Sequence, residues 1–329
     1  MSSFTGGIIH PGQLNGTGTL DATHVEEIWG EVHGTMRRMS VMAPRIKLKS
    51  LKGTSVATNF AVGKATMGKI TAGQAVTATS ASKFGKVQMT VDTVIYARTN
   101  FPLLETLQTS YDARAEVGKE HGETLARQYD ETFFIQATKA GLLTANKFGL
   151  TAAGHDGATQ VTLSGASDYL DPALLYSKIV DLITGMRKKD VDPVADGCVL
   201  LVDHDTFATL SMSELLINSE YKTSEGSSIP TMKLKAYGVD VIPSNNFVGG
   251  KNITGHLLSN VDNGNAYDGD FTKVLATMFS PKALMAAETI PLTTRMVWDE
   301  IDLNWMLTNY RSFGVAPSVA PFAGCLLKP

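Results

Sequence analysis

The chain has 329 residues, of which 43% are hydrophobic and 19% charged, and its formal net charge is −3. That composition can form a sizeable core and is unlike a disordered chain, while no run approaches the ~18 apolar residues that a membrane helix needs. The first residues lack the pattern of a secretory signal, and two cysteines cannot form a disulfide framework, so we expect synthesis in a reducing cytoplasm with Cys198 and Cys325 as small core residues.

Charge is distributed unevenly along the chain. Residues 32–91 contain ten basic residues and no acidic residue, whereas residues 92–329 contain 19 basic and 28 acidic residues. A basic stretch of this kind has three interpretations: a nucleic-acid footprint, a solvated face, or an arm that docks on the acidic surface of a neighbouring copy. Direct nucleic-acid recognition is the weakest of them, because Phe60 and Phe84 are the only aromatic residues in the stretch.

The first ninety residues predict an arm followed by an extended hairpin. Residues 1–20 are rich in Gly, Ser and Thr and suggest a mobile arm, and Asp21 is a suitable N-cap for a short helix at about 22–38. The apolar residues of 53–86 do not recur with the period of a helix, and they are too few to form a core of their own. We expect a long two-stranded hairpin that leaves the body, is stabilised by partners, and returns through a strand at 87–98.

The strongest pattern predicts a long helix that begins near Pro102, and no further proline follows until Pro172. Apolar and small residues recur at spacings of three and four, which predicts a helix of about 40 residues. The stripe narrows in the middle to small residues, among them Gly118 and Gly122. The glycines have two possible explanations: they allow another backbone to approach the helix closely, or they are tolerated without any such role.

The second half of the chain predicts a compact α/β segment. Asp171 and Pro172 begin a helix with one apolar face, and the apolar run 198–202 predicts a buried strand. Asp203 or Asp205 then caps a helix that we expect to reach about Asn218. Further strands are expected at 238–243, at 274–279, and in the β-rich tail at about 287–313.

A search for catalytic chemistry finds no convincing constellation. The S-x-x-K run at 80–83 lacks a K-T-G partner, and the acidic run 262–270 breaks the EF-hand pattern. Asp203-His204-Asp205 lies where a strand gives way to a helix, which favours capping over a metal or acid–base site. We therefore predict that the protein is not an enzyme and holds no metal and no cofactor.

Five stretches, in order along the chain, resemble the major capsid proteins of tailed double-stranded DNA bacteriophages. That family has the Hong Kong 97 fold, and the resemblance is strongest to its short-tailed T-seven-like podophages. Two of the stretches are CVLLVDHDTFATL at 198–210 and YGVDVIPSNNF at 237–247. The others are residues 53–76, 87–137 and 280–327.

The resemblance implies an α+β capsid subunit with five segments. They are an N-terminal arm at 1–44, an extended E-loop at 45–92, a P-domain with the long spine helix at 93–165, an A-domain at 166–284, and P-domain return strands at 285–329.

The resemblance also implies a function and a set of partners. Copies of the chain would form hexamers and pentamers that tile an icosahedral head around double-stranded DNA, without any membrane. The shell would assemble in the host cytoplasm as a procapsid, with a scaffolding protein and a portal protein at one vertex, and the mature protein would reside in the virion. The residues predicted for inter-subunit contact are Lys64, Lys69, Lys83, Lys86, Gly118 and Gly122. Two alternatives stay open: an encapsulin-type bacterial compartment with the same fold, and an unrelated soluble enzyme.

Overall fold

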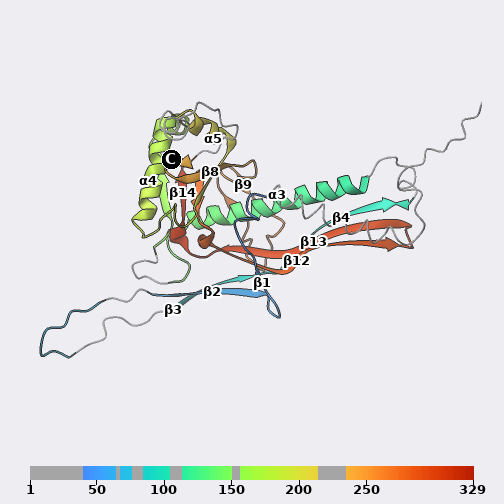
Figure 1. Ribbon diagram of the computed structural model, residues 1–329, viewed down its shortest axis with the longest axis horizontal. Helices are drawn as coiled ribbons and strands as arrows, with labels where there is room; N and C mark the ends of the chain where they lie inside the picture. Colours follow the sequence, from blue (N-terminus) through green and yellow to red (C-terminus); the bar gives the residue numbers. More distant parts are fainter. Residues whose placement is uncertain (1–39, 64–66, 76–83, 104–112, 150–155, 214–234) are drawn as a thin grey trace, which may run out of the picture. The chain divides into compact units, whose positions relative to one another are not determined.

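A computed structural model of the chain describes residues 40–63, 67–75, 84–103, 113–149, 156–213 and 235–329 (Figure 1). The arm at 1–20 and the helix expected at 22–38 lie outside these residues. The chain divides into two compact units. The first comprises residues 1–44, 93–130 and 290–313, and the second comprises 45–92, 131–289 and 314–329.

The first unit is built from a long helix packed on a sheet. Strand β4 (Ile95–Pro102) pairs antiparallel with β13 (Asn304–Pro317), and β12 (Leu284–Asp299) follows β13 in the strand order. Helix α3 (Ala113–Gly141) places Leu125 against the fully buried Leu307 of β13. Partly buried residues complete this small core, namely Phe101, Val117, Leu292 and Met296.

One expectation about this region was confirmed and one was wrong. Pro102 ends strand β4 opposite Asn304, and the next residue, Leu103, is helical, as expected for a helix that begins near Pro102. Residues 104–112 lie outside the described residues, and α3 is described from Ala113. Because β4 is the last strand in the order β1-β12-β13-β4, a residue without an N–H group is tolerated on its open side. The single strand expected at 87–98 is two strands in different sheets, β3 (Phe84–Thr90) and β4.

The second unit contains a six-stranded mixed sheet in the order β5-β14-β11-β6-β8-β7. The pairs β14–β5 and β6–β8 are parallel, and the remaining pairs are antiparallel. The six strands are β5 (Thr159–Thr162), β14 (Ala323–Leu327), β11 (Val274–Phe279), β6 (Val199–Val202), β8 (Val239–Pro243) and β7 (Lys235–Ala236). Every residue of β6 and β11 is buried, as their almost wholly apolar sequences predict for central strands; the exception is the buried Thr277 of β11.

Two helices accompany this sheet. Helix α4 (Pro172–Arg187) begins as expected, because the Asp171 side chain accepts hydrogen bonds from the N–H groups of Ala173 and Leu174. Its apolar face lies in the core and consists of Leu175, Ile179, Leu182, Ile183 and Met186. Helix α5 (His204–Ser211) ends at Ser211, which corrects the expected end near Asn218: the Met212 N–H bonds back to Thr209 and closes the last turn.

The remaining elements are short. They are β1 (Lys49–Ser50), which pairs in parallel with residues 287–288 of β12, the two-stranded pair β9 (Asn252–Ile253) and β10 (Gly269–Asp270), and the 3-10 turns Asp168–Leu170, Pro281–Ala283 and Ala320–Phe322. Among the described residues, no helix is both long enough and apolar enough to cross a membrane.

Candidate assembly surfaces

The predicted hairpin is present as a separate two-stranded sheet. Strand β2 (Val56–Val62) pairs antiparallel with β3 (Phe84–Thr90) from Val56 opposite Thr90 to Val62 opposite Phe84. Side chains alternate between two faces, and one face is buried at its base. On that face Ala57 and Met89 pack with Leu51, Val91 and Ala287, and Val87 packs with Phe148.

Gly85 sets how closely the hairpin approaches the rest of the second unit. A Cβ atom at this position would collide with the backbone carbonyl oxygen of Phe148 and would lie 2.8 Å from the Phe148 Cβ. The neighbouring Asn59 donates a hydrogen bond of 2.7 Å from its amide to the Ser318 hydroxyl. The base of the hairpin is therefore fixed by backbone proximity and a directed hydrogen bond as well as by apolar packing.

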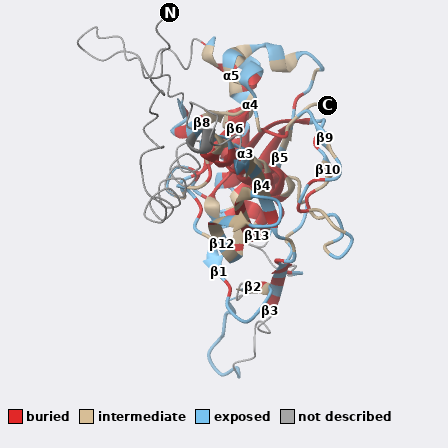
Figure 2. Cartoon of the chain, turned by 90° about the vertical axis from the view of Figure 1, so that its right-hand side faces the viewer, coloured by how far each residue is buried: buried red, intermediate tan, exposed pale blue. Residues whose placement is uncertain are grey.

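The opposite face of the hairpin presents large apolar side chains to solvent. Phe60 is 73% exposed and Phe84 is 74% exposed, and Val62 lies directly opposite Phe84. All of residues 67–75 are exposed, and they include Met67 and Ile70 (Figure 2). Apolar side chains gathered on one exposed face are typical of an interaction surface.

The four lysines predicted for inter-subunit contact all belong to this hairpin region. Lys69 and Lys86 are exposed, and Lys86 lies opposite Phe60 in the strand pair. Lys64 and Lys83 lie outside the described residues. Contact of these lysines with another copy stays a prediction, since the structure contains one chain.

Gly118 and Gly122 are both buried, on the face of α3 that also carries His121 and Leu125. His121 links this face to two strands: its Nε2 lies 2.8 Å from the Thr99 hydroxyl oxygen of β4, and its Nδ1 lies 2.7 Å from the Asn309 Nδ2 of β13. The two glycines lie on either side of His121 in the sequence, and both are buried. Their part in contact with another copy stays untested.

His121 is held in its neutral form by this arrangement. The Asn309 amide nitrogen donates to Nδ1, so Nε2 carries the proton and donates to Thr99. Burial lowers the pKa of His121, and the charge of Glu120 opposes that shift. Sequence inspection missed this residue, although it occupies a helical-face position between the two glycines.

A second buried link holds residues 40–42 to α3. Both carboxylate oxygens of Asp130 accept hydrogen bonds, which come from the Ser40 hydroxyl at 2.6 Å and from the N–H groups of Val41 at 2.8 Å and Met42 at 3.1 Å. Burial raises the pKa of Asp130, and the three donors act in the opposite direction. This carboxylate therefore fixes the point at which the N-terminal residues join the helix.

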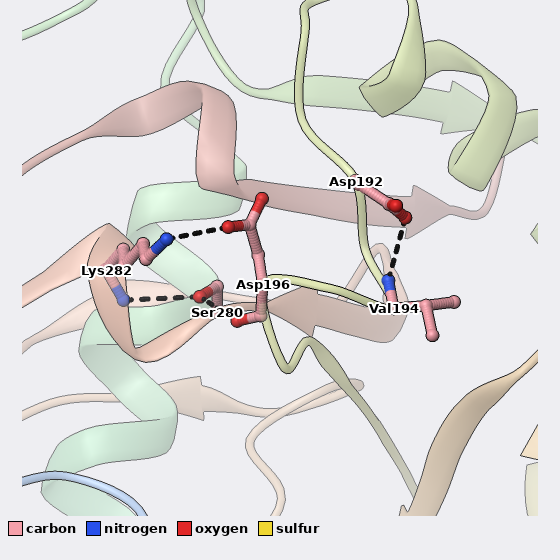
Figure 3. A network of polar contacts seen from close by, with 5 residues as sticks. All are labelled: Asp192, Val194, Asp196, Ser280 and Lys282. Atoms are coloured by element: carbon pink, nitrogen blue, oxygen red, sulfur yellow. Dashed lines mark hydrogen bonds and ion pairs between the residues drawn. The ribbon is translucent and has the colours of Figure 1, made fainter.

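A polar network in the second unit joins the turn before β6 to the residues after β11 (Figure 3). Lys282 Nζ lies 2.7 Å from an Asp196 carboxylate oxygen, and the Ser280 hydroxyl donates to the Asp196 backbone carbonyl at 2.8 Å. Asp192 accepts from the Val194 N–H at 3.2 Å within the same turn. The polar groups of this network are hydrogen-bonded or ion-paired with one another, so they stabilise the turn. None of them is an unpaired nucleophile or base.

The two cysteines are free and buried, as expected for core residues. Burial is the main cause that raises the thiol pKa of Cys198 and of Cys325 to about 12. A thiol with so high a pKa is almost entirely protonated near neutral pH and is a poor nucleophile.

Two of the polar motifs that sequence analysis set aside lie in described residues, whereas the S-x-x-K run at 80–83 lies outside them. Asp203 occupies the N-cap position of α5, although its side chain makes no capping hydrogen bond there. In the run 262–270, Asp268 accepts from the N–H groups of Gly255 and His256 and from the Ser259 hydroxyl, so its oxygens serve a turn. Within the described residues, no group of three His, Cys, Asp or Glu side chains could hold a metal ion.

Comparisons with known proteins agree with the fold. A family model described as phage capsid protein matches residues 74–324. The capsid structure of cyanophage P-SCSP1u is similar with a TM-score of 0.72 and 15% identity, covering 86% of this chain and 86% of that chain. The mature capsid of bacteriophage PhiM1 is similar with a TM-score of 0.72 and 22% identity, covering 88% and 87%.

A virus-like particle from Pyrococcus furiosus is similar with a TM-score of 0.55 and 10% identity, covering 92% of this chain and 98% of that chain. No curated protein matches the sequence. The structural matches establish a mixed helix-and-sheet subunit with the Hong Kong 97-like capsid fold.

Proposed function

Since the chain belongs to the phage capsid protein family, we propose that it is the major capsid protein of a tailed double-stranded DNA phage. It is a structural shell protein, and its place is in the virion. The observation that carries the assembly role is the β2–β3 hairpin, whose base is buried while its outer face exposes Phe60, Val62 and Phe84. A subunit that leaves such a face uncovered is completed by neighbouring copies.

The more specific parts of this proposal, namely the type of shell, its assembly and its partners, are based on the sequence resemblance. Copies form hexamers and pentamers of an icosahedral head, of the type found in T-seven-like podophages. Assembly takes place in the host cytoplasm with a scaffolding protein and a portal protein, and the head encloses double-stranded DNA. The role is structural throughout, with no catalytic step.

The encapsulin-type alternative has less support. The family model that matches is that of phage capsid proteins. The content of the particle distinguishes the two functions, because a phage head holds DNA and a compartment holds protein cargo.

The test is assembly of the full chain in the presence of its scaffolding protein. Sedimentation followed by negative-stain microscopy should show large closed particles. A persistent monomer under these conditions would contradict the proposal. Particles that form in infected cells should contain double-stranded DNA, and particles filled with an enzyme would favour the compartment instead.

The basic segment fits this role as a contact between copies. We expect Lys64, Lys69, Lys83 and Lys86 to lie mainly over acidic surface of an adjacent copy and not along packaged DNA. The support is the separation of charge between residues 32–91 and the rest of the chain. Each exposed ion pair contributes only about 0–1 kcal/mol. The pairs therefore fix how neighbouring copies align mainly because the same contact is repeated around the shell.

A further inference from the structure

The loop between β9 and β10, residues 254–268, contains the dipeptide Asn263-Gly264. Asparagine followed by glycine is the sequence most prone to deamidation, because glycine has no side chain to shield its backbone nitrogen from the neighbouring amide. The sequence contains one other such pair, Asn15-Gly16, which lies outside the described residues. The hydrogen bonds around Asn263 therefore determine whether the reaction proceeds in the folded subunit.

The reaction joins the side chain of Asn263 to the backbone of Gly264. The Gly264 nitrogen gives up its proton and forms a bond to the Asn263 Cγ atom, while the bond from Cγ to Nδ2 breaks and ammonia leaves. The resulting succinimide ring is opened by water at either of its two carbonyl groups. The products are aspartate and isoaspartate, and water is the only co-reactant.

The side-chain amide of Asn263 is anchored at both of its polar atoms. Its Nδ2 donates to the Leu258 carbonyl at 2.7 Å. Its Oδ1 accepts from the N–H groups of Asn260 at 3.1 Å and Ala266 at 3.2 Å. Cyclisation needs the Cγ atom to move to bonding distance of the next backbone nitrogen, so the anchored side chain opposes it.

The backbone of the same turn is also held. The Asn263 N–H donates to the Asn260 Oδ1 at 2.7 Å, and the Gly264 N–H donates to the Val261 carbonyl at 3.1 Å. Gly264 has a φ of 63°, in the left-handed region that glycine adopts without strain. The turn therefore uses both members of a reactive dipeptide, and it binds the proton that the attacking nitrogen would have to lose.

The loop around Asn263 in turn holds helix α3. The Ala266 carbonyl accepts from Gln136 Nε2 at 2.9 Å and from Lys139 Nζ at 2.8 Å, and both donors belong to α3. Deamidation to aspartate replaces the Asn263 Nδ2 donor with an oxygen, which then faces the Leu258 carbonyl oxygen without a proton between them. Two facing acceptors repel each other, so the product disfavours the turn that positions Ala266.

We propose that Asn263 is a deamidation site that the native loop suppresses, and that its modification weakens the hold of the loop on α3. In the folded subunit the reaction proceeds from the opened turn, so its rate is the rate of the open form multiplied by the population of that form. The extent of modification then reports how often the loop has opened. The inference goes beyond the proposed function, because it concerns the single subunit and needs no assembly.

The first test compares the folded and unfolded chain. The full-length subunit is incubated at mildly alkaline pH with and without denaturant, and peptide mass spectrometry follows the mass increase that accompanies conversion of an amide to an acid. Isomerisation at the Asp-Gly sequences 156–157, 196–197 and 268–269 does not change the mass and is not counted. We expect Asn263 and Asn15 to react at similar rates in denaturant, and Asn263 to react at least roughly tenfold more slowly without it.

The second test opens the turn by substitution. Asn260→Ala removes the acceptor of the Asn263 N–H and should raise the rate of deamidation at Asn263 several-fold in the folded subunit. The rate in denaturant should not change. Asn245→Ala is the matched control, since Asn245 is exposed and lies outside the loop.

The third test measures the consequence of the modification. Asn263→Asp represents the aspartate product and should increase hydrogen exchange at residues 131–141 of α3. Asn245→Asp introduces the same charge outside the loop and should leave that exchange unchanged.

Three outcomes would overturn the proposal. Deamidation of Asn263 at equal rates with and without denaturant, or its absence in both, would show that the loop suppresses nothing. An unchanged rate in folded Asn260→Ala would show that the turn does not provide the protection. Unaltered exchange of α3 in Asn263→Asp would remove the link between the modification and the helix.

Discussion

Replacing Gly85 with alanine tests whether the hairpin is anchored by close backbone approach. The added methyl group would meet the carbonyl oxygen and the Cβ of Phe148, and neither atom belongs to the flexible end of a side chain. Relief therefore requires the strand or the 148 backbone to move. Because Val87 packs on the same phenylalanine, such a shift also loosens the buried base of the hairpin.

The expected loss can be estimated from two opposing contributions. Forcing a methyl group into a closely packed site costs about 1–3 kcal/mol, while alanine reduces the entropy of the unfolded chain and returns about 0.4–1 kcal/mol. A net loss of about 1–2 kcal/mol raises the population of the detached hairpin roughly 5- to 30-fold.

Hydrogen exchange of the unassembled subunit measures this population, because the amides of residues 84–90 exchange when the hairpin detaches. Gly314→Ala is the matched control. A Cβ at Gly314 would lie 3.3 Å from Val91 Cγ2 and 3.4 Å from Met89 Sδ, which are side-chain atoms that can shift. Faster exchange in the Gly85 variant only is the expected result. Exchange at the natural rate in Gly85→Ala, or an equal increase in both variants, would refute the reasoning.

Four further predictions concern buried groups. The lowered pKa of His121 gives stability that is present above the unfolded value of 6.5 and is lost as the pH falls, because the unfolded chain then binds a proton that the folded chain resists. His121→Gln should therefore reduce the drop in Tm between about pH 7 and about pH 5. Asp130→Ala removes the acceptor of three hydrogen bonds and should lower the free energy of unfolding by about 2–4 kcal/mol in denaturant titrations, with a smaller loss for Asp130→Asn. With thiol pKa values of about 12, Cys198 and Cys325 should resist alkylation in the native subunit and react fully after unfolding, as mass spectrometry would show. Gly122→Leu should impair assembly or shell stability in sedimentation assays, whereas normal assembly with a higher Tm would mean that the glycine is only tolerated.

The sequence predicted the elements that have a strong local pattern. Helix α4 begins where Asp171 and Pro172 suggested, and β6, β8 and β11 occupy the expected apolar runs. The two-stranded hairpin was also predicted, because the stretch lacked both a helical period and enough apolar residues for a core. In each case the decisive information lies within a few neighbouring residues.

The boundaries and buried links depended on distant residues and could not be predicted in the same way. Pro102 directly precedes the helical residue Leu103, as its position predicted, but its place as the last residue of β4 depends on Asn304, which is distant in the sequence. The hydrogen bonds of His121 and Asp130 join residues up to 188 positions apart, and no local pattern announces such partners. Gly85 gave no signal either, because its importance arises from Phe148.

Under the proposed function, the fold of the hairpin within one chain prepares a contact that a neighbouring copy completes. Its inner face carries the small residues Ala57, Ala61 and Gly85, so the strands approach the rest of the second unit closely, while Phe60 and Phe84 are exposed on the outer face. Because side chains alternate with a period of two, a slip of one residue would exchange the two faces. Burial of the inner face within the subunit therefore fixes the register of the outer face before a neighbour arrives. A partner then meets a surface that is already ordered, which lowers the entropy cost of association and lets weak, repeated contacts add up to a stable shell.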